Sequence, residues 1–365
     1  MAEPEPCLRT ESPLDEGEYV TVAADYGNFL CVGAIEHMDV FVARLMERFQ
    51  IDADDGDLSI CFTWKDTLEE VAELCDSSVP IAGCAPGQKT ISPYTPNDHE
   101  LVHNVASLLG RPPPFFAEGI AVAHEGYDGL LNKIRAPLNV MNPIDFMEMS
   151  IEELLAVPFG DGYDVAGRFT GYLMTVHGMN AYLDLYRSLE RDADLARIDE
   201  VFRATLGVSL DDSVAEYLES WTRCWSDPLL SECEAPEVDW DGEHLEYEEQ
   251  VNCFEGDAIG PYDGSAAGRA VLHRTITIAE DATYELRLAG ETQESTGVRD
   301  VPSLIGYPYQ GVSLLGCEPC SQDYMETIEG GTPRILRLSP GKYSLRLHAA
   351  AIVTAAVAFT LKKVE

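Results

Sequence analysis

The stretch Asn97-Asp-His-Glu-Leu-Val-His103 decides how the rest of the chain is interpreted, because it places two histidines four residues apart. Residues four apart in an α-helix share a face, so the imidazoles of His99 and His103 could reach one metal ion. Glu100 lies about 100° around the helix from His99, where its carboxylate could take a proton from a metal-bound water. This pattern is typical of zinc-dependent hydrolysis.

Local signals predict that both histidines lie in a helix. Asn97 and Asp98 are favourable residues at a helix N-terminus, and Gly110 followed by Arg-Pro-Pro-Pro ends the segment. Apolar residues recur on one side of the segment, at Val102, Val105, Ala106, Leu108 and Leu109. The two imidazoles therefore have the helical backbone that a shared metal ion requires.

A third metal ligand is predicted in a second helix. Catalytic zinc commonly has three protein ligands and one open position. Residues 115–124, Phe-Phe-Ala-Glu-Gly-Ile-Ala-Val-Ala-His, form an apolar run that contains Glu118. Burying a carboxylate is costly unless a cation or strong donor pairs with it. Because Gly119 and Ala121 are small, we expect this helix to approach the first one closely.

The two segments together resemble the gluzincin type of bacterial zinc metallopeptidase, whose second helix carries an Ala/Ser-Glu-Gly-Leu/Ile-Ala pattern. Here the matching letters are His-Glu-Leu-Val-His and Phe-Phe-Ala-Glu-Gly-Ile-Ala. The likeness covers about residues 16–225, and it implies that His99, His103 and Glu118 bind Zn²⁺ while Glu100 is the general base. One departure is the spacing of fourteen residues between His103 and Glu118, which is shorter than in the best-known aminopeptidases and thermolysin-like enzymes.

A peptidase also needs a donor for the oxyanion that forms when water adds to a peptide carbonyl. The candidates in the following helical region are Tyr163, Tyr172, His177 and Tyr182. Tyr172 is the predicted donor, since it shares the apolar face of its helix. Metal-bound histidines usually donate their second N–H to a carboxylate or carbonyl, and the candidate carboxylates are Asp145, Asp161 and Asp164.

Composition restricts the class of protein. A chain of 365 residues with 45% hydrophobic residues allows two or three domains with ample core. The formal net charge of −40 opposes binding to nucleic acid or to an anionic membrane surface. It favours solubility, and it would also suit cationic substrates or high salt. The most apolar tract, 349–361, is too short to span a bilayer and is expected to be a strand.

Ten cysteines indicate an oxidising compartment and predict disulfides. The polar N-terminus has neither the basic start nor the apolar segment of a signal peptide. We therefore expect a mature or trimmed form of a protein that is secreted or held in the cell envelope. The Cys317-Glu-Pro-Cys320 segment lacks a second pair of metal ligands, which favours a local disulfide over a zinc or redox site.

The periodicity along the chain predicts an α+β fold whose residues 17–226 form a zincin-like metallopeptidase domain. Residues 1–16 are acidic and Pro-rich and are expected to be a disordered lead. A small α/β lobe precedes the zinc helix, with expected strands at 19–24 and 58–64, expected helices at 34–49 and 67–75, and a strand pair within 81–92. Further helices between 150 and 222 are expected to form a helical lower lobe.

The last third of the chain changes character. Residues 227–249 are acidic and lose periodicity, which predicts a linker. Alternating apolar residues then predict an accessory β-sandwich of about eight strands over 250–365. The segment Leu-Ser-Pro-Gly-Lys-Tyr-Ser-Leu-Arg-Leu at 338–347 resembles part of the sandwich domains on secreted bacterial peptidases. That resemblance implies a module that binds polysaccharide or protein, or one that only stabilises the enzyme.

These features together predict an exported zinc-dependent peptidase that acts on a peptide or protein substrate. A metal-activated water would attack the peptide bond, with Glu100 as general base. The alternative is a non-catalytic extracellular binding protein with a structural or vestigial zinc site, in which the sandwich carries the function. A zinc hydrolase that acts on another kind of bond is a third alternative.

Overall fold

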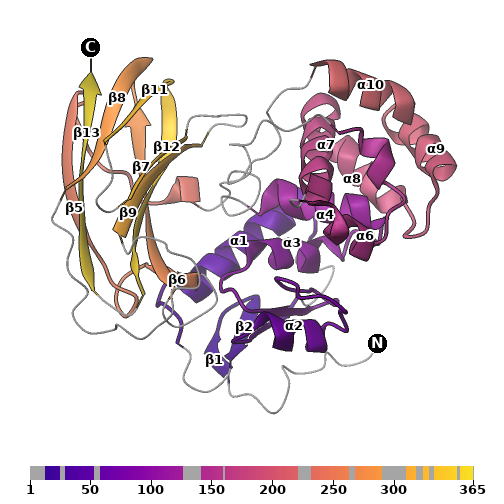
Figure 1. The fold of residues 1–365 in the computed structure, drawn as a ribbon, viewed down its shortest axis with the longest axis horizontal. Coiled ribbons are helices and arrows are strands. Elements are labelled where there is room, and N and C mark those ends of the chain that lie inside the picture. The colour runs from indigo at the N-terminus through magenta and orange to yellow at the C-terminus, as the bar shows by residue number, and fades with distance from the viewer. Residues whose placement is uncertain are drawn as a thin grey trace.

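The computed structural model describes residues 13–24, 29–52, 58–125, 141–158, 161–220, 232–262, 268–289, 310–317, 324–328, 333–351 and 354–364. Over these ranges the protein has the predicted α+β composition, with mixed elements first and strands at the C-terminal end (Figure 1). None of the helices in these ranges combines the length and the hydropathy that a bilayer crossing requires.

A four-stranded sheet lies at the N-terminal end of the fold. Its order is β1 (Pro13–Glu16), β2 (Val20–Ala24), β3 (Ile60–Trp64) and β4 (Lys89–Ser92), with β1 antiparallel to β2 and the other pairs parallel. The prediction of a disordered lead is wrong for residues 13–16, because β1 pairs with β2 through backbone hydrogen bonds. Residues 1–12 lie outside the described part of the chain.

Helices pack around this sheet and share one hydrophobic core with it. Helix α1 has the predicted bounds, and α3 and α4 carry the two predicted metal-binding segments. The helices are α1 (Ala34–Phe49), α2 (Leu68–Leu74), α3 (Asp98–Ala106), α4 (Pro114–His124), α6 (Ile151–Ala156), α7 (Asp161–His177), α8 (Met179–Ser188), α9 (Leu195–Thr205) and α10 (Leu210–Ser220), with the 3-10 turn η3 (Pro143–Phe146) before α6.

Gly119 contributes to a close helix contact, but not to the predicted one. A Cβ on Gly119 would lie 2.3 Å from Thr170 Oγ1 and 2.8 Å from the carbonyl oxygen of Ala166, both in α7. The small residue therefore lets α4 approach α7 rather than α3. The sequence pattern identified the need for a small side chain without identifying the neighbour.

Two antiparallel sheets form the C-terminal part and enclose a second hydrophobic core. Their strand orders are β10-β9-β12-β7-β6 and β11-β8-β13-β5. The strands are β5 (His244–Val251), β6 (Ile259–Tyr262), β7 (Arg269–Ile278), β8 (Ala282–Ala289), β9 (Gln310–Gly316), β10 (Tyr324–Ile328), β11 (Arg334–Leu338), β12 (Gly341–Ala350) and β13 (Ala355–Val364). Figure 1 shows these sheets beside the N-terminal end of α1.

The predicted acidic linker at 227–249 is wrong for most of the residues that the structure describes there. Residues 232–234 form the 3-10 turn η5 (Glu232–Glu234), and the N–H of Val238 donates to the carbonyl oxygen of Thr275 over 2.8 Å. Residues 244–249 belong to β5, which pairs with β13. The exposed positions of β5 are all polar, and Glu246 and Glu248 are two of the four, so the strand has the composition of a linker.

Three disulfides are present among the described residues: Cys31–Cys253, Cys75–Cys84 and Cys233–Cys317. No cysteine in those ranges is free. The predicted local disulfide at 317–320 is wrong, because Cys317 pairs with Cys233 across 84 residues of sequence. Disulfides persist in oxidising compartments, so these bonds agree with a location outside the reducing cytosol.

Candidate metal centre

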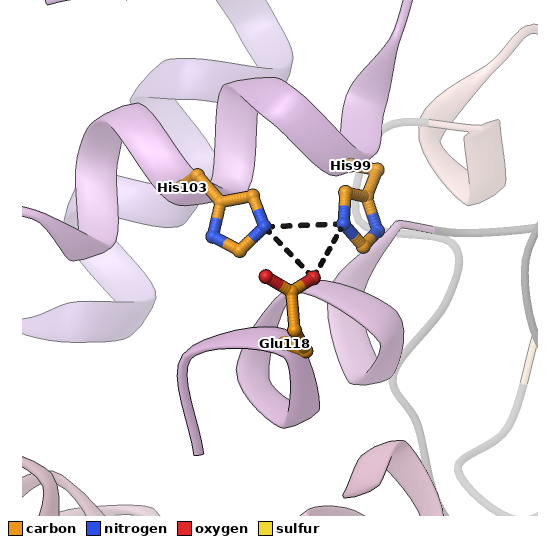
Figure 2. A group of neighbouring side chains, drawn as sticks. All are labelled: His99, His103 and Glu118. Carbon is orange, nitrogen blue, oxygen red and sulfur yellow. Dashed lines mark hydrogen bonds and ion pairs between the residues drawn. The ribbon is translucent and has the colours of Figure 1, made fainter. Parts of the chain in front are cut away.

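Three side chains from two helices converge at one point. Helix α3 provides His99 and His103, whose Nε2 atoms are 3.1 Å apart, and α4 provides Glu118 (Figure 2). Oε2 of Glu118 lies 3.1 Å from Nε2 of His99 and 3.2 Å from Nε2 of His103. The structure thus brings together the three residues that the sequence predicted as ligands, and they could hold a metal ion.

The size of this triangle fits a small cation. A tetrahedral centre with bonds of about 2.0 Å to nitrogen and oxygen has ligand–ligand edges of about 3.3 Å. The three edges here are 3.1, 3.1 and 3.2 Å. Burial alone would raise the pKa of Glu118, yet the adjacent His103 and His99 hold it well below its ordinary value of 4.5. Glu118 therefore presents a charged carboxylate to the site.

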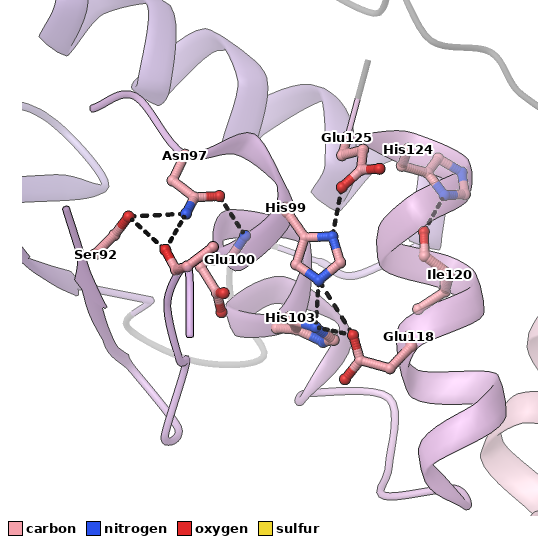
Figure 3. A network of polar contacts seen from close by, with 10 residues as sticks. Ser92, Asn97, His99, Glu100, His103, Glu118, Ile120, His124 and Glu125 are labelled. Carbon is pink, nitrogen blue, oxygen red and sulfur yellow. Dashed lines mark hydrogen bonds and ion pairs between the residues drawn. The ribbon is translucent and has the colours of Figure 1, made fainter. Parts of the chain in front are cut away.

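Glu125 orients His99 from the opposite side of the ring. Nδ1 of His99 lies 2.5 Å from Oε2 of Glu125, which directs Nε2 towards Glu118 (Figure 3). Although burial opposes it, the charges of Glu125 and Glu118 raise the pKa of His99 well above 6.5. Sequence reasoning missed Glu125. The available signal was its position seven residues after Glu118, on the same face of α4 and its extension.

Glu100 lies beside the three donors without joining them. It is 5% exposed, and burial raises the pKa of its carboxyl group above the ordinary value of 4.5. Figure 3 shows it on the side of Asn97 and Ser92, away from Glu125. Its N–H donates to Oδ1 of the N-cap residue Asn97 over 3.3 Å. The predicted general base is therefore close to the candidate metal site and shielded from bulk water.

A tethered segment around Gly83 covers Glu100. A Cβ on Gly83 would lie 2.6 Å from Oε1 of Glu100, so a larger residue at this position would have to displace the carboxylate. The next residue, Cys84, is bound to Cys75 and exchanges two backbone hydrogen bonds with Ile91 of β4. The carbonyl oxygen of Ala82 accepts from Ser92 Oγ at 3.1 Å and from Asn97 Nδ2 at 3.3 Å.

The backbone N–H and C=O groups of Gly83 point away from β4. In an antiparallel pair, a residue that exchanges both hydrogen bonds with its partner is flanked by residues whose N–H and C=O point outward. Cys84 is such a residue, and within the described ranges Gly83 makes no backbone hydrogen bond. An open main-chain edge therefore lies next to Glu100.

Among the predicted oxyanion donors, Tyr163 borders the centre. Its ring centroid is 6.1 Å from that of His99. Burial raises the pKa of its hydroxyl, as do the charges of Glu118 and Glu100 and a hydrogen bond to Glu118. The preferred candidate, Tyr172, instead packs against Phe169, and its charged neighbour is Glu216.

The other candidates also have partners elsewhere. The hydroxyl of Tyr182 lies 3.4 Å from Thr170 Oγ1, and the charged neighbour of His177 is Glu216. The candidate carboxylates for orienting a histidine were Asp145, Asp161 and Asp164, but Glu125 holds that position at His99. The side chain of Asp161 lies outside the described part of the structure. The sequence favoured Tyr172 because it shares the apolar face of its helix, yet that face packs into the core rather than towards the centre. Tyr163 instead lies in the first turn of α7, near His99 of α3 and Glu118 of α4.

No family model matches the chain. An uncharacterized protein of Treponema pallidum (strain Nichols) is 29% identical over 126 residues, which is 32% of this chain and 12% of that relative. The aligned part is thus a small share of the relative's length.

Three solved structures match the chain distantly. The pre-peptidase C-terminal domain of collagenase from Bacillus anthracis has a TM-score of 0.22 and 14% identity, and the match covers 36% of this chain and 95% of that domain. PliG from Aeromonas hydrophila, a periplasmic inhibitor of g-type lysozyme, has a TM-score of 0.21 and 12% identity, with 35% of this chain and 91% of PliG covered. PliG from Salmonella Typhimurium has the same score and identity, with 35% and 96% covered.

Proposed function

We propose that this protein is an exported zinc-dependent peptidase of the gluzincin type, with a zincin-like domain around α3 and α4. The observation that carries the proposal is the triangle of two imidazole nitrogens and one carboxylate oxygen, with Glu100 buried beside it and not part of it. A structural zinc site usually has four protein ligands, whereas a catalytic one keeps a position open. Three donors and a separate carboxylate are the set that hydrolysis requires.

The donor set favours zinc among the common metal ions. Calcium and magnesium prefer oxygen ligands, and calcium also needs longer bonds. Two imidazoles with one carboxylate suit zinc and neighbouring transition metals. His99, His103 and Glu118 would hold the ion. When bound, zinc supplies a Lewis acid and lowers the pKa of a water molecule towards neutrality.

The residues of the chain would then move the protons. Glu100 accepts a proton from the attacking water and gives it to the leaving amine, and its raised pKa suits both steps. The hydroxyl of Tyr163 donates to the oxyanion. The outward peptide groups of Gly83 bind the main chain of an extended substrate, as exposed sheet edges do in peptide recognition. The three disulfides agree with secretion or a place in the cell envelope.

The test is the variant Glu100→Gln, which keeps the shape of the side chain and removes the base. We expect unchanged zinc content and a loss of at least about 100-fold in the hydrolysis of peptides from a fluorogenic library. His103→Ala should lose both zinc and activity. Glu152 is an exposed residue of α6, so Glu152→Gln is the matched control and should change neither zinc content nor activity.

Two outcomes would count against the proposal. Hydrolysis that continues unchanged in Glu100→Gln would show that this carboxylate is not the base. A wild-type protein that binds zinc but cleaves no member of a library of protein-derived and cell-wall-like peptides would favour the alternative, a binding protein with a structural metal site.

A further inference from the structure

A cluster of buried polar side chains lies where the C-terminal sheets meet α1. Arg346 of β12 and Glu232 of η5 are each 6% exposed, and Arg346 Nε donates to Glu232 Oε2 over 2.9 Å. Glu232 also accepts from the hydroxyl of Ser344 over 3.1 Å. Burying charges is costly, so a buried ion pair is favourable only when its geometry is good and further hydrogen bonds satisfy its remaining polar atoms. The peptidase mechanism proposed above uses none of these residues.

His37 joins this cluster to the metal centre. It lies on α1, is 7% exposed, and its ring centroid is 6.2 Å from that of His273 in β7. On its other side, Nε2 of His37 lies 3.3 Å from Oδ1 of Asp98. Asp98 is the first residue of α3 and directly precedes His99. One imidazole thus lies between the sandwich and the first turn of the helix that provides two metal ligands.

The start of α1 is attached to the sandwich by its backbone. The N–H groups of Val32 and Gly33 each donate over 2.9 Å, to the carbonyl oxygens of Cys253 and Ala258. Cys31 forms a disulfide with Cys253. A Cβ on Gly33 would lie 2.6 Å from the carbonyl oxygen of Asp257, so no side chain fits between the two parts. The contact is therefore close and specific, unlike a flexible tether between independent modules.

We infer that the β-sandwich is part of the scaffold of the metal centre, and that His37 is a positioning residue which holds Asp98 and thereby the first turn of α3. The sandwich fixes the N-terminal end of α1, α1 presents His37, and His37 fixes the backbone that carries His99. This inference rests on the proposed metal site, but it does not depend on peptidase activity.

The first experiment compares two variants of His37 in the full chain. His37→Leu introduces an apolar side chain of similar size and removes the contact with Asp98. His37→Gln keeps an N–H donor. With zinc alone as probe, in competition with a chromogenic chelator, we expect His37→Leu to bind zinc about 10-fold more weakly, and His37→Gln to recover most of the affinity. In peptide hydrolysis, His37→Leu should lower kcat with little change in KM.

Val42→Ala is the control for simple loss of stability. Val42 lies on the same helix and is fully buried in the core. The variant should lower Tm at least as much as His37→Leu and leave zinc affinity unchanged. If Val42→Ala and His37→Leu weaken zinc binding equally, the effect of His37 is general destabilisation and the inference is overturned.

The second experiment disturbs the contact between the sandwich and the start of α1. Gly33 has a φ of −80°, which alanine adopts freely, so Gly33→Ala acts only as a wedge against Asp257. We expect weaker zinc binding although the substitution touches no residue of the centre. Gly256→Ala is the matched control, because its site is open, and its positive φ of 77° costs only stability.

Unchanged zinc affinity in both His37→Leu and Gly33→Ala would overturn the inference and leave the proposed function intact. A wild-type protein that binds no zinc would overturn both. If Gly33→Ala does not fold, the His37 pair still decides the question.

Discussion

Tyr163 is the residue that we propose as the oxyanion donor of this centre. The hydroxyl of Tyr163 is protonated at neutral pH and can donate a hydrogen bond, and its raised pKa keeps it protonated further into the alkaline range. Tyr163→Phe removes that donor while leaving the ring beside His99. We expect kcat for peptide hydrolysis to fall about 100-fold, with KM and zinc content nearly unchanged, in steady-state assays with metal analysis.

Tyr172→Phe is the matched control on the same helix. The side chain of Tyr172 is 2% exposed and packs against aromatic rings, so its loss of a hydroxyl should leave kcat within a factor of about two. Equal losses in the two variants would show that neither hydroxyl acts on the reaction. A loss confined to Tyr172→Phe would restore the sequence-based choice.

His124 should make stability depend on pH. It is fully buried at the end of α4, where Nδ1 contacts the carbonyl oxygen of Ile120 over 2.8 Å and Nε2 has no hydrogen-bond partner among the residues that the structure describes. Burial lowers its pKa to about 4, and nearby Arg48 acts in the same direction. The pKa of His124 is lower in the folded state than in the unfolded state, so the unfolded state takes up a proton first as the pH falls. The free energy of unfolding is therefore at its full value above pH 6.5 and decreases as the pH falls towards 4.

The measurement is urea unfolding of wild type and His124→Leu at several pH values. Between pH 7 and pH 4, the difference in unfolding free energy should move by up to about 3 kcal/mol in favour of the variant. Taking the difference cancels the titration of the other buried histidines. A difference that stays constant over this range would contradict the low pKa of His124.

At the residue scale, the sequence was most informative where chemistry depends on helical spacing. Two histidines four apart and a carboxylate within an apolar helix suffice to predict that His99, His103 and Glu118 meet. Tyr163 and Glu125 could not be chosen in this way. Their roles depend on how α7 and the end of α4 lie relative to α3, and that is a property of packing between elements.

At the element scale, the α4–α7 contact at Gly119 is sensitive to added volume. Gly119→Ala would place a methyl group against Thr170 Oγ1 and the carbonyl oxygen of Ala166. We expect the free energy of unfolding to fall by about 1–3 kcal/mol, measured by urea denaturation. Glu118 precedes Gly119, so zinc affinity should fall as well if α4 shifts.

A second substitution separates the two clashes. Thr170→Ala removes the side-chain clash but cannot move the backbone oxygen of Ala166. Gly119→Ala should therefore cost less unfolding free energy when it is made in the Thr170→Ala variant than when it is made in the wild type. If Gly119→Ala costs no unfolding free energy in the Thr170→Ala variant, the backbone of α7 can move away from the new methyl group. If Gly119→Ala costs none in the wild type, the two helices are not closely packed.

The elements that the sequence predicted well are those with strong amphipathic periodicity. Helix α1 buries a regular face, and its predicted and observed bounds agree. Strand β5 was missed because exposed glutamates alternate with its inward residues, and one inward position is Glu249, which pairs with Arg274. An acidic strand of this kind looks like a linker until its partner β13 is known.

At the scale of the whole molecule, two disulfides have different expected roles. Cys31–Cys253 closes 222 residues of sequence and joins the sandwich to the start of α1. Cys75–Cys84 closes 9 residues and anchors Gly83 above Glu100. Chain entropy predicts that the first contributes about 5 kcal/mol to stability and the second about 3 kcal/mol. For catalysis we expect the reverse: loss of Cys75–Cys84 should lower the rate of hydrolysis more than loss of Cys31–Cys253.

The paired variants Cys31→Ser with Cys253→Ser, and Cys75→Ser with Cys84→Ser, test this crossover by Tm, zinc affinity and peptide hydrolysis. The first pair should show the larger loss of Tm and nearly normal kcat, because the backbone hydrogen bonds of Val32 and Gly33 still hold α1 in the folded state. The second pair should lose less Tm but more kcat, with zinc retained, since the cover over Glu100 is released while the three donors remain. If activity follows Tm in both pairs, the Gly83 segment has no part in catalysis beyond the stability of the fold.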